Sequence, residues 1–72
     1  MARPANGQLA DCLFQARRDK KLTQKDLSHM TGIPQPTISQ LEQGKLNPSY
    51  KTIQRLATAM GKKVQVVLMD IN

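Results

Sequence analysis

Residues 24–43, which read QKDLSHMTGIPQPTISQLEQ, decide the local organisation of this chain. Thr23 precedes them and can cap a helix, and Asp26 three residues later completes a capping-box pair. Gly32 can adopt a positive φ and so end that helix. Pro36 suits the first turn of a second helix, where the N–H that it lacks would have no partner. The stretch therefore predicts two short helices joined by a tight turn.

Apolar residues on both sides of this stretch also recur at helical spacing. Leu9, Leu13 and Ala16 follow the pattern i, i+4, i+7, which predicts a helix that ends near residue 20. Ser49 can cap a fourth helix, and Gly61 can end it. The inner faces of the second, third and fourth helices are expected to carry Leu27, Met30, Ile38, Leu41, Ile53, Leu56, Ala57 and Met60.

The segment after Gly61 changes character, because residues 64–69, VQVVLM, are rich in valine and contain neither proline nor glycine. This composition predicts a β-strand. A single strand cannot satisfy its own backbone, and the rest of the chain offers no second strand. We expect it to pair antiparallel with its copy in a homodimer and to pack on the fourth helix near Leu56 and Met60. A frayed tail, or pairing with another protein, stays open as an alternative. The residues expected at this dimer interface are Val64, Val66, Val67 and Leu68.

The length of 72 residues allows a single domain. We expect a flexible tail over residues 1–7, a helical domain over residues 8–61 and the strand region over residues 62–72. Eleven Lys and Arg against five Asp and Glu give a net charge of +6. This basic balance favours a nucleic-acid partner, although ribosomal, heparin-binding and membrane-surface proteins share it.

Composition also excludes several classes of function. The single cysteine, Cys12, excludes a disulfide scaffold, and the single histidine, His29, excludes a histidine cluster for metal. The longest apolar stretch, residues 66–69, is too short to span a membrane, and residues 1–8 lack the apolar core of a signal peptide. Paired carboxylates, a Ser/His/Asp set and a P-loop are absent. We therefore expect no enzyme activity, no cofactor and a cytoplasmic location.

Four blocks in order carry a resemblance to a known family: LTQKDL (22–27), TGI (31–33), TISQLEQG (37–44) and NPS (47–49). Over roughly residues 13–61 the chain resembles the Cro/C1-type, or XRE, helix-turn-helix family. The strand after the last helix is similar to that of the HipB-like antitoxin branch, in which it pairs with its copy in the other subunit. The resemblance implies an all-α, lambda-repressor-like DNA-binding domain of four to five helices, with a short C-terminal β-strand.

The resemblance also implies roles for individual residues. The second helix of the motif would enter the major groove, where Gln can bond to adenine and Ser or Thr to several bases. The implied base contacts are Gln35, Thr37, Ser39 and Gln40. The implied phosphate contacts are Gln24, Gln43, Lys45, Asn47 and Ser49. Arg17 and Glu42 are implied as a structural ion pair that ties the first helix to the third.

These features lead to the hypothesis of a sequence-specific DNA-binding transcriptional repressor. It would bind double-stranded operator DNA with an inverted repeat, as a homodimer. Within that class, the strand favours an autoregulating antitoxin of a type II toxin–antitoxin operon, with a cognate toxin as a further partner. Two alternatives stay open, which are a stand-alone phage-type regulator and a protein-interaction module that neutralises a toxin while DNA binding is incidental.

Overall fold

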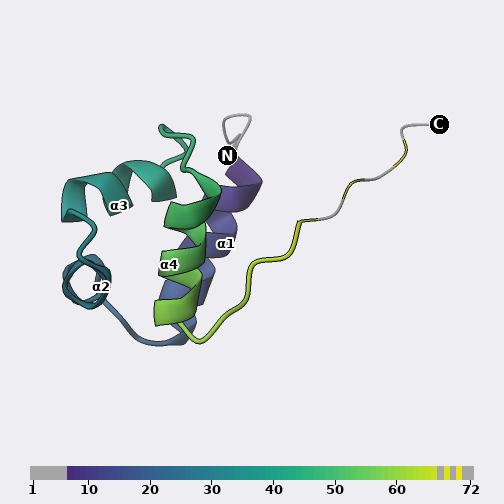
Figure 1. The fold of residues 1–72 in the computed structure, drawn as a ribbon. Helices are drawn as coiled ribbons and strands as arrows, with labels where there is room; N and C mark the ends of the chain where they lie inside the picture. The colour runs from purple at the N-terminus through teal and green to yellow at the C-terminus, as the bar shows by residue number, and fades with distance from the viewer. Residues whose placement is uncertain (1–6, 67, 69, 71–72) are drawn as a thin grey trace.

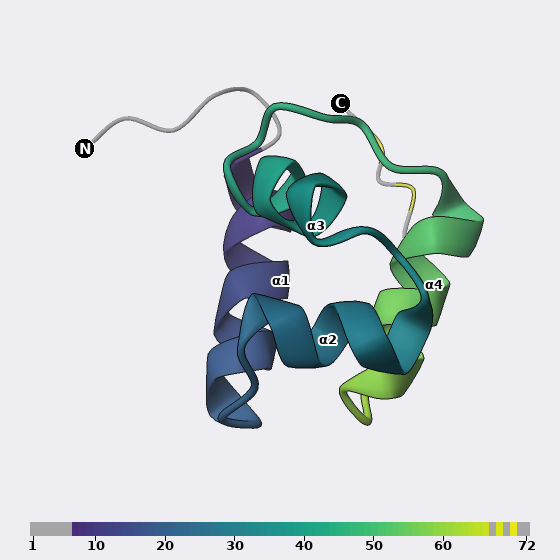
Figure 2. The same ribbon diagram turned by 90° about the vertical axis from the view of Figure 1, so that its left-hand side faces the viewer.

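The computed structural model describes residues 7–66, 68 and 70. This part of the chain contains four helices, α1 (Gly7–Asp19), α2 (Gln24–Thr31), α3 (Gln35–Glu42) and α4 (Tyr50–Ala59). α2 and α3 lie on one side of the molecule, and α1 and α4 lie next to them (Figure 1). From the side of α2 and α3, α2 crosses between α1 and α4, with α3 next to it (Figure 2). The expected all-α, helix-turn-helix class of fold is confirmed.

α1 begins at Gly7, which the sequence analysis assigned to the N-terminal tail. The remainder of that expected tail, residues 1–6, lies outside the described residues. The four helices match the lower end of the expected number of four to five.

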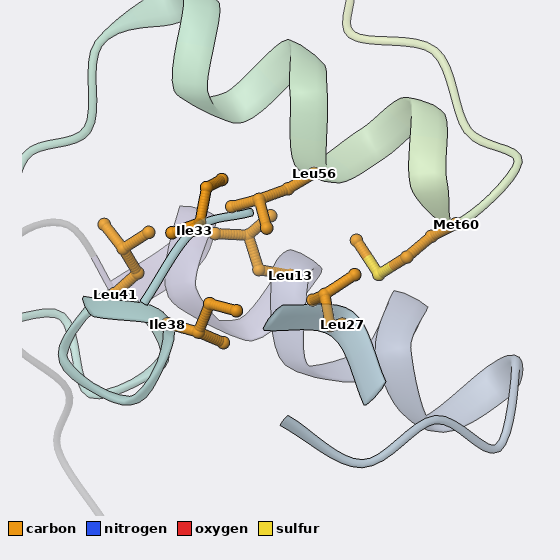
Figure 3. Packing of buried hydrophobic residues seen from close by; sticks show 7 residues of the cluster. All are labelled: Leu13, Leu27, Ile33, Ile38, Leu41, Leu56 and Met60. Carbon is orange, nitrogen blue, oxygen red and sulfur yellow. The ribbon is translucent and has the colours of Figure 1, made fainter. Parts of the chain in front are cut away.

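The hydrophobic core draws side chains from all four helices and from the turn between α2 and α3 (Figure 3). Fully burying one aliphatic side chain contributes roughly 1.5–3 kcal/mol, so these few residues dominate the stability of such a small domain. Ile38 and Leu41 attach α3 to this core by its inner face, which leaves the opposite face of α3 to solvent. The seven residues of the core cluster are Leu13, Leu27, Ile33, Ile38, Leu41, Leu56 and Met60.

Met30 does not belong to the core, and its expected place on the inner face of α2 is wrong. Its side chain is 54% exposed, whereas Leu27 on the same helix is buried. Three residues of α-helix turn the side chain to about 60° from the direction of Leu27. Since α2 ends one residue later, at Thr31, Met30 lies at the edge of the contact between α2 and α4.

Side-chain caps fix the starts of α2 and α4, as the sequence predicted. The Thr23 hydroxyl accepts a hydrogen bond from the Asp26 amide, and the Asp26 carboxylate accepts one from the Thr23 amide, each at 2.9 Å. The Ser49 hydroxyl accepts from the Thr52 amide at 3.1 Å. Pro34, at the N-cap of α3, offers no such cap, but Pro36 in the first turn has no amide that needs one.

α1 and α4 end in the same backbone motif, with a left-handed residue that follows the last turn. At the end of α1 the residue is Lys21 (φ 57°), and the Leu22 amide donates to the Arg17 carbonyl at 3.1 Å. At the end of α4 it is Gly61 (φ 69°), and the Lys62 amide donates to the Ala57 carbonyl at 2.8 Å. This pattern is a Schellman motif, in which glycine is the preferred left-handed residue and lysine is strained.

The expected C-terminal strand is not formed in the described residues, which show no strand over 62–66, 68 and 70. A strand requires a neighbouring strand for its backbone hydrogen bonds, and one copy of this chain supplies none. The segment instead turns away from α4 on the side opposite α2 and α3 (Figure 1). Val67, one of the expected interface residues, lies outside the described residues.

Met60 and Val64 line the same groove between α1 and α4, and the expected docking of the strand near Leu56 and Met60 stays a prediction. The side chains of Leu56 and Met60 are only 1% exposed, because the core of their own chain surrounds them. The groove is also lined by Leu9, Ile53 and Ala57 among others.

Candidate nucleic-acid interface

The outer face of α3 presents polar side chains to solvent. Pro36, Gln40 and Gln43 follow the spacing i, i+4, i+7, and all three are exposed. Gln35 is exposed at the start of the helix, while Thr37 and Ser39 are half-buried at the edges of this face. The expected base-contact residues therefore divide into two accessible glutamines and two partly covered hydroxyl residues.

A hydrogen bond within α3 orients two of the candidate residues. The Gln43 amide nitrogen donates to the Ser39 hydroxyl at 2.9 Å. The hydroxyl keeps its own proton for donation, and the Gln43 side-chain oxygen remains an acceptor. Ser39 and Gln43 thus form one polar unit, although Ser39 was expected to contact a base and Gln43 a phosphate.

The loop from Gly44 to Ser49 is joined to the end of α3 through its backbone. The Lys45 amide donates to the Gln40 carbonyl at 2.9 Å, so the exposed Lys45 side chain starts directly beside the outer face of α3. Asn47 is also exposed in this loop. The Ser49 hydroxyl already accepts the Thr52 amide as the cap of α4, so a phosphate contact by Ser49 would have to share this group.

Gln24 is turned toward α3 in this structure. Its side-chain nitrogen donates to Glu42 Oε1 at 3.1 Å, and the residue is half-buried. Nothing in the sequence indicated this bond, since the two residues are 18 positions apart and only the fold brings them together. A phosphate contact by Gln24 would therefore use its remaining side-chain and backbone groups at the start of α2.

Arg17 and Glu42 join α1 to the end of α3. Arg17 Nε lies 2.7 Å from Glu42 Oε2, and Arg17 Nη2 lies 3.0 Å from Glu42 Oε1. Arg17 Nη1 also donates to the Leu22 carbonyl at 2.8 Å, and the guanidinium lies 5.4 Å from the centre of the Phe14 ring. The hydrogen bonds that Arg17 donates to Glu42 raise the pKa of Arg17 above its ordinary value.

This contact has an electrostatic consequence for the outer face of α3. Glu42 is the only charged residue among the eight of α3, and it is 7% exposed and paired with Arg17. A carboxylate on the outer face would repel DNA phosphates, whereas this one is directed inward and neutralised. The outer face of α3 is therefore uncharged, with Lys45 beside its C-terminal end.

Polar contacts in the turn between α2 and α3 set how the two helices meet. The Ser28 hydroxyl donates to the Ile33 carbonyl at 2.6 Å, and the Thr31 hydroxyl donates to the Leu27 carbonyl at 2.8 Å. The Ile33 amide in turn donates to the Thr31 hydroxyl at 3.1 Å. A polar residue at 28 is unusual where small apolar residues are expected, and its hydroxyl satisfies a backbone carbonyl of the turn.

The part of the chain that the structure describes contains no group of residues that fits another class of site. Cys12 is an exposed free thiol, and no cluster of three or more His, Cys, Asp or Glu that could hold a metal ion occurs within residues 7–66, 68 and 70. Among the same residues, no helix has both the length and the apolar character needed to cross a membrane.

The fold and the outward face of α3 define the chain as a helix-turn-helix domain. The sequence profile of the family described as helix-turn-helix matches residues 13–67. The chain belongs to this family, the Cro/C1-type or XRE group of DNA-binding transcription regulators.

Three proteins that are similar to this chain differ in kind. An uncharacterised HTH-type transcriptional regulator of Haemophilus influenzae is 33% identical over 82% of this chain and 60% of its own length. Antitoxin HigA1 of Mycobacterium tuberculosis is 33% identical over 83% of this chain and 40% of its own length. Multiprotein-bridging factor 1b of Arabidopsis thaliana is 34% identical over 81% of this chain and 41% of its own length. This chain thus spans about 40–60% of the lengths of these curated relatives.

A solved structure has a similar fold. A chain from a toxin–antitoxin module of Streptococcus pneumoniae superposes with a TM-score of 0.68 at 34% identity. The match covers 86% of this chain and 69% of that chain.

Proposed function

We propose that this chain is a sequence-specific transcriptional repressor that binds operator DNA as a homodimer. The observation that carries the proposal is the outer face of α3, which is uncharged, polar and held outward by the buried Ile38 and Leu41. An α-helix fits the major groove of B-DNA, where glutamine can bond to two atoms of one adenine. The protein acts in the cytoplasm and performs no catalysis.

The proposed roles divide the interface into groups that contact bases and groups that contact phosphates. Phosphate contacts fix the position of the protein on the duplex, and base contacts determine the sequence. The proposed base contacts are Gln35, Thr37, Ser39 and Gln40. The proposed phosphate contacts are Gln24, Gln43, Lys45, Asn47 and Ser49.

The finer proposal is an antitoxin that represses its own operon and also binds a cognate toxin. Two comparisons support it: the relative named antitoxin HigA1 and the similar chain from a toxin–antitoxin module. The second candidate is a regulator without a toxin, which the relative named as a transcriptional regulator favours.

Footprinting on the fragment upstream of the gene tests the repressor. A two-fold dimer places its recognition helices one DNA turn apart, so the protected site should be an inverted repeat with half-sites about 10 bp apart. A single asymmetric half-site bound by a monomer would contradict the homodimer. No preference for any fragment over random DNA would contradict sequence-specific binding.

Co-expression with the neighbouring reading frames distinguishes the antitoxin from the regulator. For the antitoxin, one neighbouring product should stop growth when expressed alone, and it should copurify with this chain and lose its toxicity when both are expressed. If neither neighbour is toxic or bound, the regulator without a toxin is the better description.

A further inference from the structure

Four exposed lysines gather where α1 and α4 end. Lys20 and Lys21 follow α1, and Lys62 and Lys63 follow the turn after α4. The Lys20 ammonium nitrogen lies 3.4 Å from the position that a Cβ atom on Gly61 would take, so the two pairs of lysines meet in space. Figure 1 and Figure 2 both place this end of the molecule opposite the loop between α3 and α4. We refer to these four residues as the terminal lysine cluster.

Little of the positive charge in this cluster is neutralised by the protein itself. Among the described residues, none of the four lysines forms an ion pair. Asp19, the last residue of α1, lines the same groove as Lys62 and Lys63 and offsets one of the four charges. The remaining positive charge lies open to solvent and can attract an anionic partner.

Lys21 adopts a backbone conformation that glycine would adopt without strain. It has φ 57°, whereas Gly61 occupies the equivalent position after α4 with φ 69°. A positive charge is favourable at the C-terminal end of a helix, but Lys20 and Arg18 already supply it there. Strained residues of this kind concentrate at functional sites. The side chain of Lys21 therefore indicates a role beyond ending the helix.

The proposed recognition face contributes little of the charge that favours DNA binding. The outer face of α3 is uncharged, and Lys45 lies beside it. Contacts to phosphates supply essentially all of the sequence-independent affinity for DNA. We propose that the terminal lysine cluster binds phosphates of the DNA that flanks each operator half-site, beyond the phosphate assigned to Gln24. The inference rests on the proposed repressor and adds a second, sequence-independent contact surface to it.

The start of α2 connects the cluster to the proposed interface. Lys21 lies three residues before Gln24, in the loop that leads from the end of α1 to the start of α2 (Figure 2). Three residues span at most about 10 Å, and successive phosphates of one strand advance about 3.4 Å along the duplex. A duplex whose backbone continues from Gln24 toward the end of α1 thus offers roughly three further phosphates over that distance.

Duplexes of two lengths test the inference. The short one contains the protected inverted repeat alone, and the long one adds about 10 bp, one turn of DNA, of unrelated sequence at each end. The native chain should bind the long duplex more tightly, and the slope of log K against log salt should be steeper by about 0.9 for each added phosphate contact. For two contacts, the advantage of the long duplex should fall about tenfold between about 50 and about 200 mM salt. Fluorescence anisotropy measures both quantities.

Two double variants of equal charge separate position from net charge. Lys62→Gln with Lys63→Gln should remove much of the advantage of the long duplex and leave binding to the short duplex nearly unchanged. Lys51→Gln with Arg55→Gln removes the same charge from an exposed part of α4 beside Met30, and it should keep that advantage. Thermal unfolding of both double variants shows whether either one is destabilised.

Lys21→Gly distinguishes DNA contact from a purely structural role. Relief of the left-handed strain should raise the melting temperature, and loss of the ammonium group should reduce the advantage of the long duplex. A variant that is more stable and keeps the full advantage would show that Lys21 does not meet a phosphate.

The outcomes separate this inference from the proposed function. If the native chain binds a short and a long operator duplex equally, or if both double variants lose the same advantage, the cluster makes no flanking contact and the repressor stands. If the Lys62 and Lys63 variant binds every duplex as the native chain does, the cluster serves an acidic protein partner instead. If the native chain prefers no fragment over random DNA, the repressor is wrong and the flanking contact is wrong with it.

Discussion

The guanidinium of Arg17 and the carboxylate of Glu42 meet through two hydrogen bonds, at 2.7 and 3.0 Å, and join the end of α1 to the end of α3. Gln24 from the start of α2 donates to the same carboxylate, so three helices meet at Glu42. The side chains of Arg17 and Glu42 are only 12% and 6% exposed. This contact fixes the orientation of α3, and with it the direction in which the candidate base-contacting residues point.

Replacement of Glu42 should destabilise the folded protein for this reason. Glu42→Ala leaves a half-buried guanidinium and the Gln24 amide without their shared acceptor, and it should lower the free energy of unfolding by about 2–4 kcal/mol. Urea denaturation measures the change. The exposed charge of Lys25 provides the control, since Lys25→Ala should change stability by less than about 0.5 kcal/mol. Equal effects of the two variants would show that the contact contributes nothing.

Replacing the left-handed residue at the end of α1 with glycine should stabilise the protein. Lys21 has φ 57°, a conformation that strains a residue with a Cβ atom, and Lys21→Gly should raise the free energy of unfolding by about 0.5–1 kcal/mol. Gly61 occupies the same position after α4, so Gly61→Ala should lower stability by about 1 kcal/mol. Thermal unfolding of both variants tests the pair. A loss of stability in Lys21→Gly would mean that lysine contributes more there than its strain removes.

The capping box of α2 should make stability depend on pH in the acid range. The Thr23 amide, and secondarily its hydroxyl, hydrogen-bond to Asp26 and lower the pKa of this carboxyl group below its ordinary value. A group whose pKa is lower in the folded state stabilises the protein above its unfolded pKa of about 3.9. This contribution is lost as the pH falls through the folded pKa. Asp26→Asn should therefore be less stable than the native chain at pH 6, and the difference should shrink below about pH 4. Urea midpoints across this range measure it, and a difference that does not change with pH would contradict the account.

Two substitutions should separate base recognition from phosphate contact. Gln40→Ala should weaken binding to the operator by about 1–3 kcal/mol and leave binding to random DNA nearly unchanged. Lys45→Ala should weaken binding to both, and it should reduce the slope of log K against log salt by about one per subunit. Gel shifts at several salt concentrations measure both effects. If each variant lost operator and random DNA equally, the proposed division of the interface would be wrong.

The amino-acid sequence predicts the four helices and the side-chain caps of α2 and α4. Thr23 with Asp26, Ser49 with its helix, and the glycine at 61 act within a few residues of the chain, so their effects follow from local sequence. The spacing of Leu13, Leu27, Ile38 and Leu56 likewise predicted most of the core, since helical periodicity decides which side chains share a face.

Contacts between residues far apart in the sequence depend on how the helices pack. Gln24 meets Glu42, and Met30 is exposed rather than buried, because both outcomes depend on how α2 lies against its neighbours and not on its own periodicity. Residues 64–69 have the composition of a strand, but composition supplies no hydrogen-bonding partner, and within one copy the described residues of that segment form no strand. Pairing is a property of two segments in space, so a second copy of the chain must decide it.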